Sequence, residues 1–165
     1  MASRVDLSAF SCSVARTLDV VGDRWTLLVL RDAFYGVRRF EDFTRDLGIA
    51  RNVLSDRLGR LVDTGVMERR QYEKHPPRFD YRLTAKGRDL LPVLLTMMHW
   101  GDTWAGPDDD APIDLIHRDC GQSTHAVTTC AACGDELTPF NVTVAPLPPV
   151  IDEVVRRRRT APATS

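Results

Sequence analysis

Apolar residues near the start of the chain recur at helical spacing in two short blocks. In CSVARTLDVVG, residues 12–22, the apolar side chains share one helix face, and Gly22 ends the block. The next block, RWTLLVLRDAFYG at 24–36, is apolar almost all round, and Asp23 is placed to cap its start. The pattern predicts two helices, of which the second is the central core element.

Two further blocks predict a pair of short amphipathic helices. They are RRFEDFTRDLG at 38–48 and ARNVLSDRLGRLVDTG at 50–65, joined by a Gly-Ile turn at Gly48. The second block has a stripe of leucines and a polar, basic outer face. This arrangement predicts a helix-turn-helix, a motif whose second helix enters the DNA major groove.

The periodicity changes in VMERRQYEKHPPRFDYRLT, residues 66–84. Phe79, Tyr81 and Leu83 alternate with charged residues, and KHPP is a turn signal. We expect a β-hairpin with a basic, proline-containing tip. A helix-turn-helix followed by such a hairpin is a winged helix, so the predicted fold class is mainly α with a small β wing (α+β).

The block AKGRDLLPVLLTMMHWGDTW, residues 85–104, predicts one more helix. Thr84 can cap it, and Pro92 should kink it or mark its effective start. Its apolar residues cover more than one face, so the helix needs two partners. We expect one to be its own domain and the other a second subunit, which makes the protein a homodimer.

Composition sets limits on the class of protein. The chain has 165 residues, of which 43% are hydrophobic, enough for one ordinary domain and an appendage. No apolar run approaches the ~18 residues of a membrane helix, and no signal-peptide stretch begins the chain. We therefore expect a cytoplasmic protein with no membrane partner. Residues 38–86 carry 12 Lys/Arg against 8 Asp/Glu, a basic balance compatible with nucleic acid.

These blocks together resemble the HxlR-type transcriptional regulators, which are bacterial winged-helix proteins distantly similar to MarR-type regulators. DVVGDRWTLLVLRD, RRFEDF, NVLSDRL, PPRFDYRLTAKG and the closing Trp-Gly follow in the family's order over about residues 12–104. The resemblance implies a homodimer with two recognition helices in successive major grooves of a near-palindromic operator. Ala50 departs from the family pattern, in which many members carry a serine that can cap the recognition helix.

The start of the predicted recognition helix carries the candidates for reading bases. They are Arg51, Asn52 and Ser55, since arginine suits guanine and asparagine suits adenine. Phosphate contacts position a protein on DNA without specifying sequence, and we expect them from Arg38, Arg57, Lys74 and Arg78. The alternative is that these residues are only solvated charges on helix and loop surfaces.

The stretch HRDCGQSTHAVTTCAACG, residues 117–134, contains three of the four cysteines. It holds two units in which a ligand-capable residue stands three before a Cys-Gly pair. This spacing is typical of a structural, tetrahedral Cys3His zinc site, and the glycines allow the positive φ of such turns. The predicted ligands are His117, Cys120, Cys130 and Cys133, with His125 a rival for the histidine position. The alternative is a redox pair of Cys130 and Cys133, or buried thiols.

Cys12 stands apart at the start of the first predicted helix. A helix N-terminus lowers the pKa of a thiol and so favours the reactive thiolate. The family resemblance also implies sensing, since some members detect oxidants or electrophiles through a cysteine at this position. The alternative is a small residue that packs in the dimer interface.

The chain is therefore predicted to be divided in four. Residues 1–104 form the winged-helix DNA-binding and dimerisation domain, 105–116 a linker, 117–144 a zinc-ribbon-like module and 145–165 a largely disordered basic, proline-rich tail. We expect no enzyme, but a sequence-specific regulator of double-stranded DNA, acting as a repressor, that responds to a small-molecule effector or to thiol modification. The alternatives are a thiol oxidoreductase using Cys130 and Cys133, and a protein-interaction module that does not bind DNA.

Overall fold

A computed structural model describes residues 12–105 and 113–145. The chain forms two compact units, Met1–Ala126 and Val127–Ser165. The predicted disordered tail lies outside the described residues except for Ala145, and so does most of the predicted linker. Within the described residues, no helix has both the length and the apolar character needed to cross a membrane.

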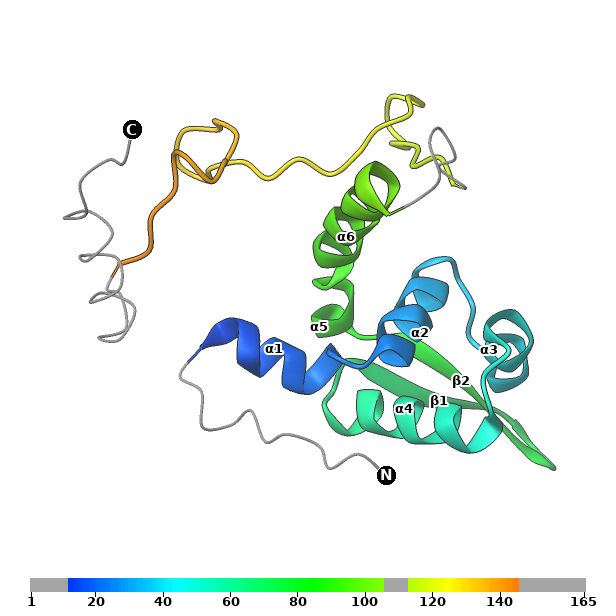
Figure 1. Cartoon of the computed structure of the whole chain (residues 1–165). Coiled ribbons are helices and arrows are strands. Elements are labelled where there is room, and N and C mark those ends of the chain that lie inside the picture. The colour runs from blue at the N-terminus through cyan, green and yellow to red at the C-terminus, as the bar shows by residue number, and fades with distance from the viewer. Residues whose placement is uncertain (1–11, 106–112, 146–165) are drawn as a thin grey trace. The chain divides into compact units, whose positions relative to one another are not determined.

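The first unit contains the helices and the hairpin that the sequence predicts, in the predicted order (Figure 1). Asp23 caps the second helix as expected, since its Oδ1 accepts the N–H groups of Trp25 and Thr26. Gly48 ends the third helix with a φ of 59°. The elements are α1 (Ser13–Val21), α2 (Arg24–Phe34), α3 (Phe40–Leu47), α4 (Arg51–Asp63), β1 (Met67–Lys74), β2 (Pro77–Leu83), α5 (Ala85–Arg88) and α6 (Leu91–Trp104).

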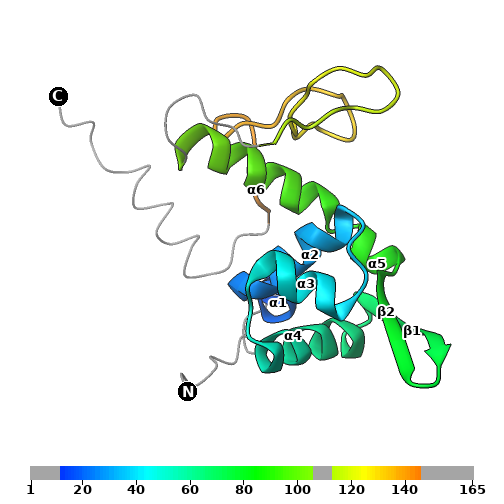
Figure 2. The same ribbon diagram turned by 90° about the vertical axis from the view of Figure 1, so that its right-hand side faces the viewer.

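β1 and β2 form an antiparallel hairpin that projects beyond the helices (Figure 2). Met67 pairs with Leu83 at its base, and Lys74 pairs with Pro77 at its tip. The chain before α3 joins the other edge of β2, because the Tyr81 N–H donates to the Arg38 carbonyl at 2.8 Å. The sheet is thus fixed to the helix-turn-helix, and the predicted winged helix is confirmed.

The core is built where α2, α3, α4 and the base of the wing meet. As predicted, α2 contributes central residues and α4 buries its leucine stripe. Asp32 on α2 is also buried, and burial raises the pKa of its carboxyl although Arg31 pairs with it at 2.7 Å. The sequence pattern did not indicate this buried acid. Side chains with no exposed surface are Val29, Leu30, Phe43, Leu54, Leu58 and Leu61.

The last predicted helix is two helices, so the prediction of one continuous element over 85–104 was wrong. Thr84 caps α5 by accepting the Gly87 N–H at 3.1 Å, as expected. The helix α5 ends at Arg88, and a new helix, α6, begins at Leu91. Pro92 lies in the first turn of α6, so the proline marks the start of this helix, as one of the two predicted outcomes has it. No residue of α6 is buried within the described structure, and Trp100 and Trp104 are 62% and 74% exposed.

Candidate DNA-binding interface and cysteine knuckles

The first turns of α4 present three exposed polar side chains, Arg51, Asn52 and Ser55. Ala50 precedes the helix and gives no side-chain cap, as the sequence indicated. The Arg51 guanidinium lies over the Phe40 ring at 4.8 Å, and its Nη2 is 3.6 Å from Oε1 of Glu41. These contacts hold the guanidinium beside α3, and the side chain is still 65% exposed, so it is accessible to a base edge.

Arg57, predicted as a phosphate contact, has partners within the protein. Its Nε is 3.0 Å from Asp23 Oδ1 and its Nη1 is 2.8 Å from Asp56 Oδ2. The side chain is only 23% exposed. Arg57 therefore links α4 to the capping residue of α2, and its contact with phosphate stays a prediction.

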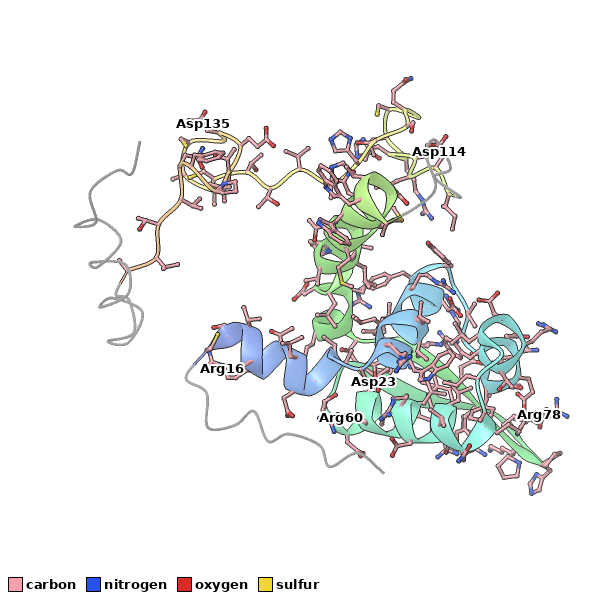
Figure 3. The ribbon with its side chains drawn as sticks, in the orientation of Figure 1. Arg16, Asp23, Arg60, Arg78, Asp114 and Asp135 are labelled. Atoms are coloured by element: carbon pink, nitrogen blue, oxygen red, sulfur yellow. The ribbon has the colours of Figure 1, made fainter. Side chains whose placement is uncertain are left out.

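The wing carries the other predicted phosphate contacts. Lys74 and Arg78 are exposed next to the hairpin turn, and Figure 3 shows Arg78 toward the end of the wing. Arg69 lies 3.5 Å from the centre of the Phe79 ring and Arg39 lies 5.0 Å from that of Tyr72. These arginine–aromatic pairs were not predicted, although the interleaving of arginines and aromatic residues on paired strands could have indicated them.

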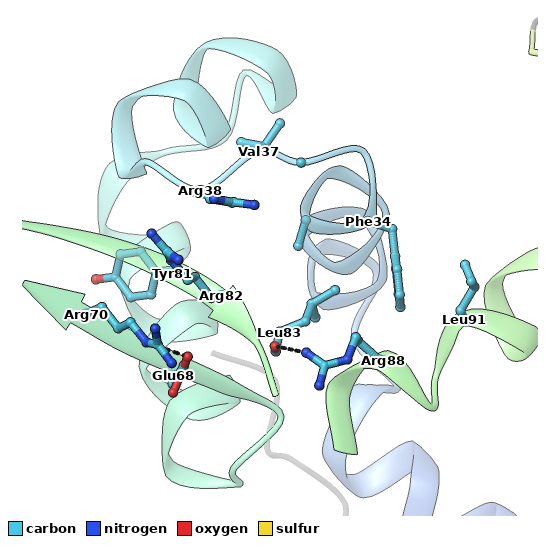
Figure 4. A pocket seen from close by; sticks show the side chains of 12 residues that line it. Phe34, Val37, Arg38, Glu68, Arg70, Tyr81, Arg82, Leu83, Arg88 and Leu91 are labelled. Atoms are coloured by element: carbon cyan, nitrogen blue, oxygen red, sulfur yellow. Dashed lines mark hydrogen bonds and ion pairs between the residues drawn. The ribbon is translucent and has the colours of Figure 1, made fainter. Parts of the chain in front are cut away.

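Arg38, the remaining predicted phosphate contact, lines a pocket of about 530 Å³ between the end of α2 and the base of the wing (Figure 4). Within the described part of the chain it makes no ion pair or hydrogen bond through its side chain. Three more arginines face this pocket, with apolar side chains between them. They are Arg70, Arg82 and Arg88.

The charges of this pocket are only partly neutralised. Arg70 pairs with Glu68 at 2.7 Å, and Arg82 pairs with Asp80 at 3.0 Å. Arg88 donates to the Leu83 carbonyl at 3.0 Å, a contact that leaves its charge unbalanced. The Nε of Arg82 is buried and has no hydrogen-bond acceptor among the described residues. The pocket is thus a concave, cationic surface that the sequence analysis did not identify.

A second hollow, of about 410 Å³, is lined almost entirely by apolar side chains of α2 and α6, together with residues 113–115. Met97 on the exposed part of α6 contributes to it. On α1, Val14 and Leu18 are also exposed. The first unit therefore leaves apolar surface open on its first and last long helices.

Cys12 is exposed and is the N-cap residue of α1. The backbone N–H groups of Ala15 and Val14 lower the pKa of its thiol, with a smaller contribution from the charge of Arg16. The predicted placement at a helix N-terminus is confirmed, and its role in sensing stays a prediction.

The first cysteine knuckle, residues 115–124, is a tight hydrogen-bonded turn at the end of the first unit. The Gly121 N–H donates to the His117 carbonyl at 2.8 Å, and Gly121 has a φ of 69°. His117 Nδ1 lies 3.3 Å from Cys120 Sγ. The two predicted ligands of this knuckle therefore lie together.

The second knuckle, residues 128–137, has the same construction in the second unit. The Gly134 N–H donates to the Cys130 carbonyl at 2.8 Å, and Gly134 has a φ of 82°. The N–H groups of Cys133 and Ala132 are directed at the Cys130 sulfur and lower the pKa of its thiol. All three cysteines of the knuckles are free thiols.

Among the described residues, no three His, Cys, Asp or Glu side chains gather as a metal site. His125, the rival ligand, stacks its ring on that of His99 at a distance of 4.5 Å between centroids. The predicted zinc site stays a prediction.

Comparison with known proteins identifies the family. The HxlR-like helix-turn-helix family matches residues 20–109. An HTH-type transcriptional regulator of Mycobacterium tuberculosis, Rv3095, is 47% identical over 136 residues, which are 82% of this chain and 86% of that protein.

Solved structures agree with this assignment. The transcription factor PA1607 is 40% identical with a TM-score of 0.76, over 84% of this chain and 96% of that one. The redox regulator HypR in its reduced form is 34% identical with a TM-score of 0.53, over 56% of this chain and 92% of that one. The chain therefore belongs to the HxlR family of helix-turn-helix proteins and is a DNA-binding transcriptional regulator.

Proposed function

We propose that the protein acts as a homodimeric repressor that binds a near-palindromic operator. The observation that carries this proposal is the exposed trio Arg51, Asn52 and Ser55 on the first turns of α4. Recognition helices read bases with these first turns, while a wing contacts the backbone beside them. A regulator that occupies a promoter in this way blocks polymerase, which is the simplest route to repression.

Dimerisation is supported by the uncovered apolar surface on α1 and α6. Trp100, Trp104 and Met97 lie largely exposed on α6, and Val14 and Leu18 on α1. Monomeric soluble proteins rarely expose large apolar patches, and α6 carries several exposed apolar side chains on one helix. A second copy of the chain would cover this apolar surface. A two-fold dimer would also present two recognition helices to a palindromic operator.

Cys12 is the proposed point of thiol control. Its lowered pKa places more of the reactive thiolate in solution near neutral pH than an ordinary cysteine has. HypR, a structural relative, is a redox regulator. The expected test is alkylation of the reduced protein by iodoacetamide at a series of pH values. Cys12 should reach its half-maximal rate at a lower pH than a free cysteine, whereas an equal midpoint would contradict a reactive thiol.

The arginine-lined pocket is the proposed site of a small anionic effector. Glu68 pairs with Arg70 and Asp80 pairs with Arg82, so the charges of Arg38 and Arg88 in this hollow are left unbalanced. Carboxylates and phosphates are the groups that arginine forks bind best. A ligand seated between α2 and the wing base would change the position of the wing relative to α4, and with it the fit to an operator.

The DNA-binding proposal is tested by fluorescence anisotropy with the duplex upstream of the protein's own gene and a scrambled duplex, over a salt series. The native duplex should be preferred at physiological salt. Arg51→Ala should weaken specific binding by about 5- to 150-fold, because a bidentate base contact contributes about 1–3 kcal/mol. Arg118→Ala, an exposed arginine outside the winged helix, is the matched control and should bind as the wild type does.

Two results would contradict the proposal. Specific binding unchanged in Arg51→Ala and in Asn52→Ala would show that α4 does not read the operator through its first turn. Absence of binding to any duplex at low salt would favour the protein-interaction alternative, since nonspecific binding by a basic winged helix persists at low salt.

A further inference from the structure

The arginine-lined pocket lies on the face of the wing sheet that points away from α4. Met67 at the base of β1 is buried in the same core as the leucine stripe of α4. Successive residues of a strand point to opposite faces, so Glu68 and Arg70 lie on the other face, and Arg82 lies opposite Glu68 on the neighbouring strand. Figure 4 shows these three side chains at the pocket. A small molecule can therefore occupy the pocket while α4 faces a duplex.

The four arginines that line the pocket differ in how their charges are balanced. Arg70 and Arg82 each pair with a carboxylate of their own strand. Arg38 and Arg88 have no carboxylate partner among the residues that the structure describes. Arg38 precedes α3 and Arg88 ends α5, so the two unbalanced charges come from different segments of the chain. Arginine forks bind carboxylates and phosphates through two parallel hydrogen bonds, so the pocket favours an anion.

Apolar side chains form the wall of the pocket around Arg88. They are Phe34 at the end of α2, Leu83 at the end of β2 and Leu91 at the start of α6 (Figure 4). The volume of about 530 Å³ lies within the range of about 300–1,000 Å³ found for small-molecule sites, which combine apolar walls with a few charged groups. A free phosphate would leave this wall in water, whereas a ligand with an apolar body would cover it.

The acceptor groups of the pocket favour a carboxylate over a phosphate. Glu68 is the one acid among the described residues that line it, and the Leu83 carbonyl, to which Arg88 donates, faces the same hollow. A phosphate ester carries about 1.5 to 2 negative charges at neutral pH, against one for a carboxylate. Repulsion by these acceptors is therefore weaker for a carboxylate, whose plane also matches the guanidinium fork.

We propose that this pocket binds a small monocarboxylic acid with an apolar body. Its carboxylate pairs with Arg38, and its body lies against Phe34, Leu83 and Leu91. This inference rests on the effector function proposed above and gives the chemical class of the ligand. The Arg38 carbonyl accepts the Tyr81 N–H of β2 at 2.8 Å, so a ligand held by Arg38 connects the chain before α3 and the wing to the start of α6.

The first experiment titrates the full-length protein, without DNA, into 2-naphthoate, a fluorescent apolar carboxylate whose anisotropy reports binding. Its uncharged counterpart, 2-naphthamide, should bind at least about 10-fold more weakly, because a hydrogen bond to a charged group contributes more than one to a neutral group. Inorganic phosphate should not displace the naphthoate. Since no DNA is present, the result does not depend on operator binding.

Substitutions locate the carboxylate within the pocket. Arg38→Ala should weaken naphthoate binding by about 10- to 150-fold, and Arg38→Lys by less, since lysine keeps the charge and loses the fork. Glu68→Gln should strengthen binding by about 2- to 5-fold, because it releases the charge of Arg70. Arg45→Ala removes an exposed arginine of α3 outside the pocket and is the matched control, which should bind naphthoate as the wild type does.

Three results would overturn the proposal. Equal binding of naphthoate and naphthamide, or unchanged naphthoate binding in Arg38→Ala, would show that the probe covers exposed apolar surface such as that of α6. Displacement of naphthoate by inorganic phosphate would show that the pocket selects a phosphate group. Operator affinity measured with saturating naphthoate tests the effector role separately. Unchanged operator affinity, with naphthoate bound, would contradict that role, whereas absence of operator binding under all conditions would contradict only the proposed reading of DNA.

Discussion

The winged helix and the knuckle region are stabilised in different ways. In the winged helix, Val29, Leu30 and Phe43 are fully buried, and Asp23 caps the start of α2. Residues 113–145 bury no side chain and hold their shape by backbone hydrogen bonds around Gly121 and Gly134. The first region relies on the removal of apolar surface from water, and the second on turn geometry.

Removing the zinc that the sequence predicts should have the largest effect on this contrast. Bound zinc contributes about 10–16 kcal/mol to the folding of small zinc modules, so a chelator should unfold the knuckles alone. In hydrogen–deuterium exchange, the amides of His117 and Cys130 should lose protection while those of α2 to α4 keep it. If α2 to α4 lost protection equally, or the knuckles kept theirs, the two regions would not differ in the way described.

Replacing one leucine by alanine in each region tests whether only the winged helix is stabilised by a hydrophobic core. Leu58 is fully buried, so Leu58→Ala should lower the free energy of unfolding by about 2–5 kcal/mol. Leu137 in the second knuckle is 37% exposed, so Leu137→Ala should cost less than about 1 kcal/mol. Urea unfolding followed by circular dichroism at the helix band measures both. Comparable losses would contradict a core confined to the winged helix.

Two helical glycines test how closely the elements of the winged helix are packed. A Cβ on Gly87 would lie 2.2 Å from the Val66 carbonyl oxygen, so Gly87→Ala should destabilise the protein by about 1–3 kcal/mol. A Cβ on Gly59 in α4 would meet no atom within 4 Å, so Gly59→Ala should stabilise it by about 0.5–1 kcal/mol. Thermal unfolding measures the two signs, and a stabilising Gly87→Ala would show that the base of the wing is not packed closely on α5.

The smallest expected effects concern the start of α2. Asp23→Ala removes both the cap and the ion pair with Arg57, and should cost about 1–2 kcal/mol. Asp23→Asn keeps a capping oxygen and loses only the ion pair, which should cost less than about 1 kcal/mol because the pair is partly exposed. Chemical denaturation at low and high salt separates the two contributions. A larger loss in Asp23→Asn than in Asp23→Ala would contradict the capping role.

Periodicity predicted most of the winged helix because its elements bury one face each. The positions of α1 to α4, the wing and the cap at Thr84 could be predicted from local patterns. The break between α5 and α6 could be predicted only as far as Pro92 marks it, because the apolar residues continue across it. The close approach of Gly87 to Val66 could not be predicted, since a contact between distant segments leaves no trace in local spacing.

In the candidate site, the sequence could predict only those residues whose position follows from their own helix or strand. The outward position of Arg51 and Asn52 follows from their place at the start of an amphipathic helix. The partners of Arg57 could not be predicted, because Asp23 is 34 positions away and meets it only through the packing of α2 on α4. The same holds for the pocket of arginines, because its four arginines come from a loop, two strands and a helix. Burial of Asp32 likewise depends on neighbours that the local pattern does not contain.

The exposed surface of α6 has a consequence for how promoter occupancy depends on protein concentration. If two chains must meet to cover that helix, the concentration of the DNA-binding form rises with the square of the chain concentration when dimers are scarce. Promoter occupancy then changes more steeply with protein level than simple saturation allows. A regulator of this kind responds to a threshold in its own synthesis, and the steepness is set by how tightly a helix without buried residues is held by its counterpart.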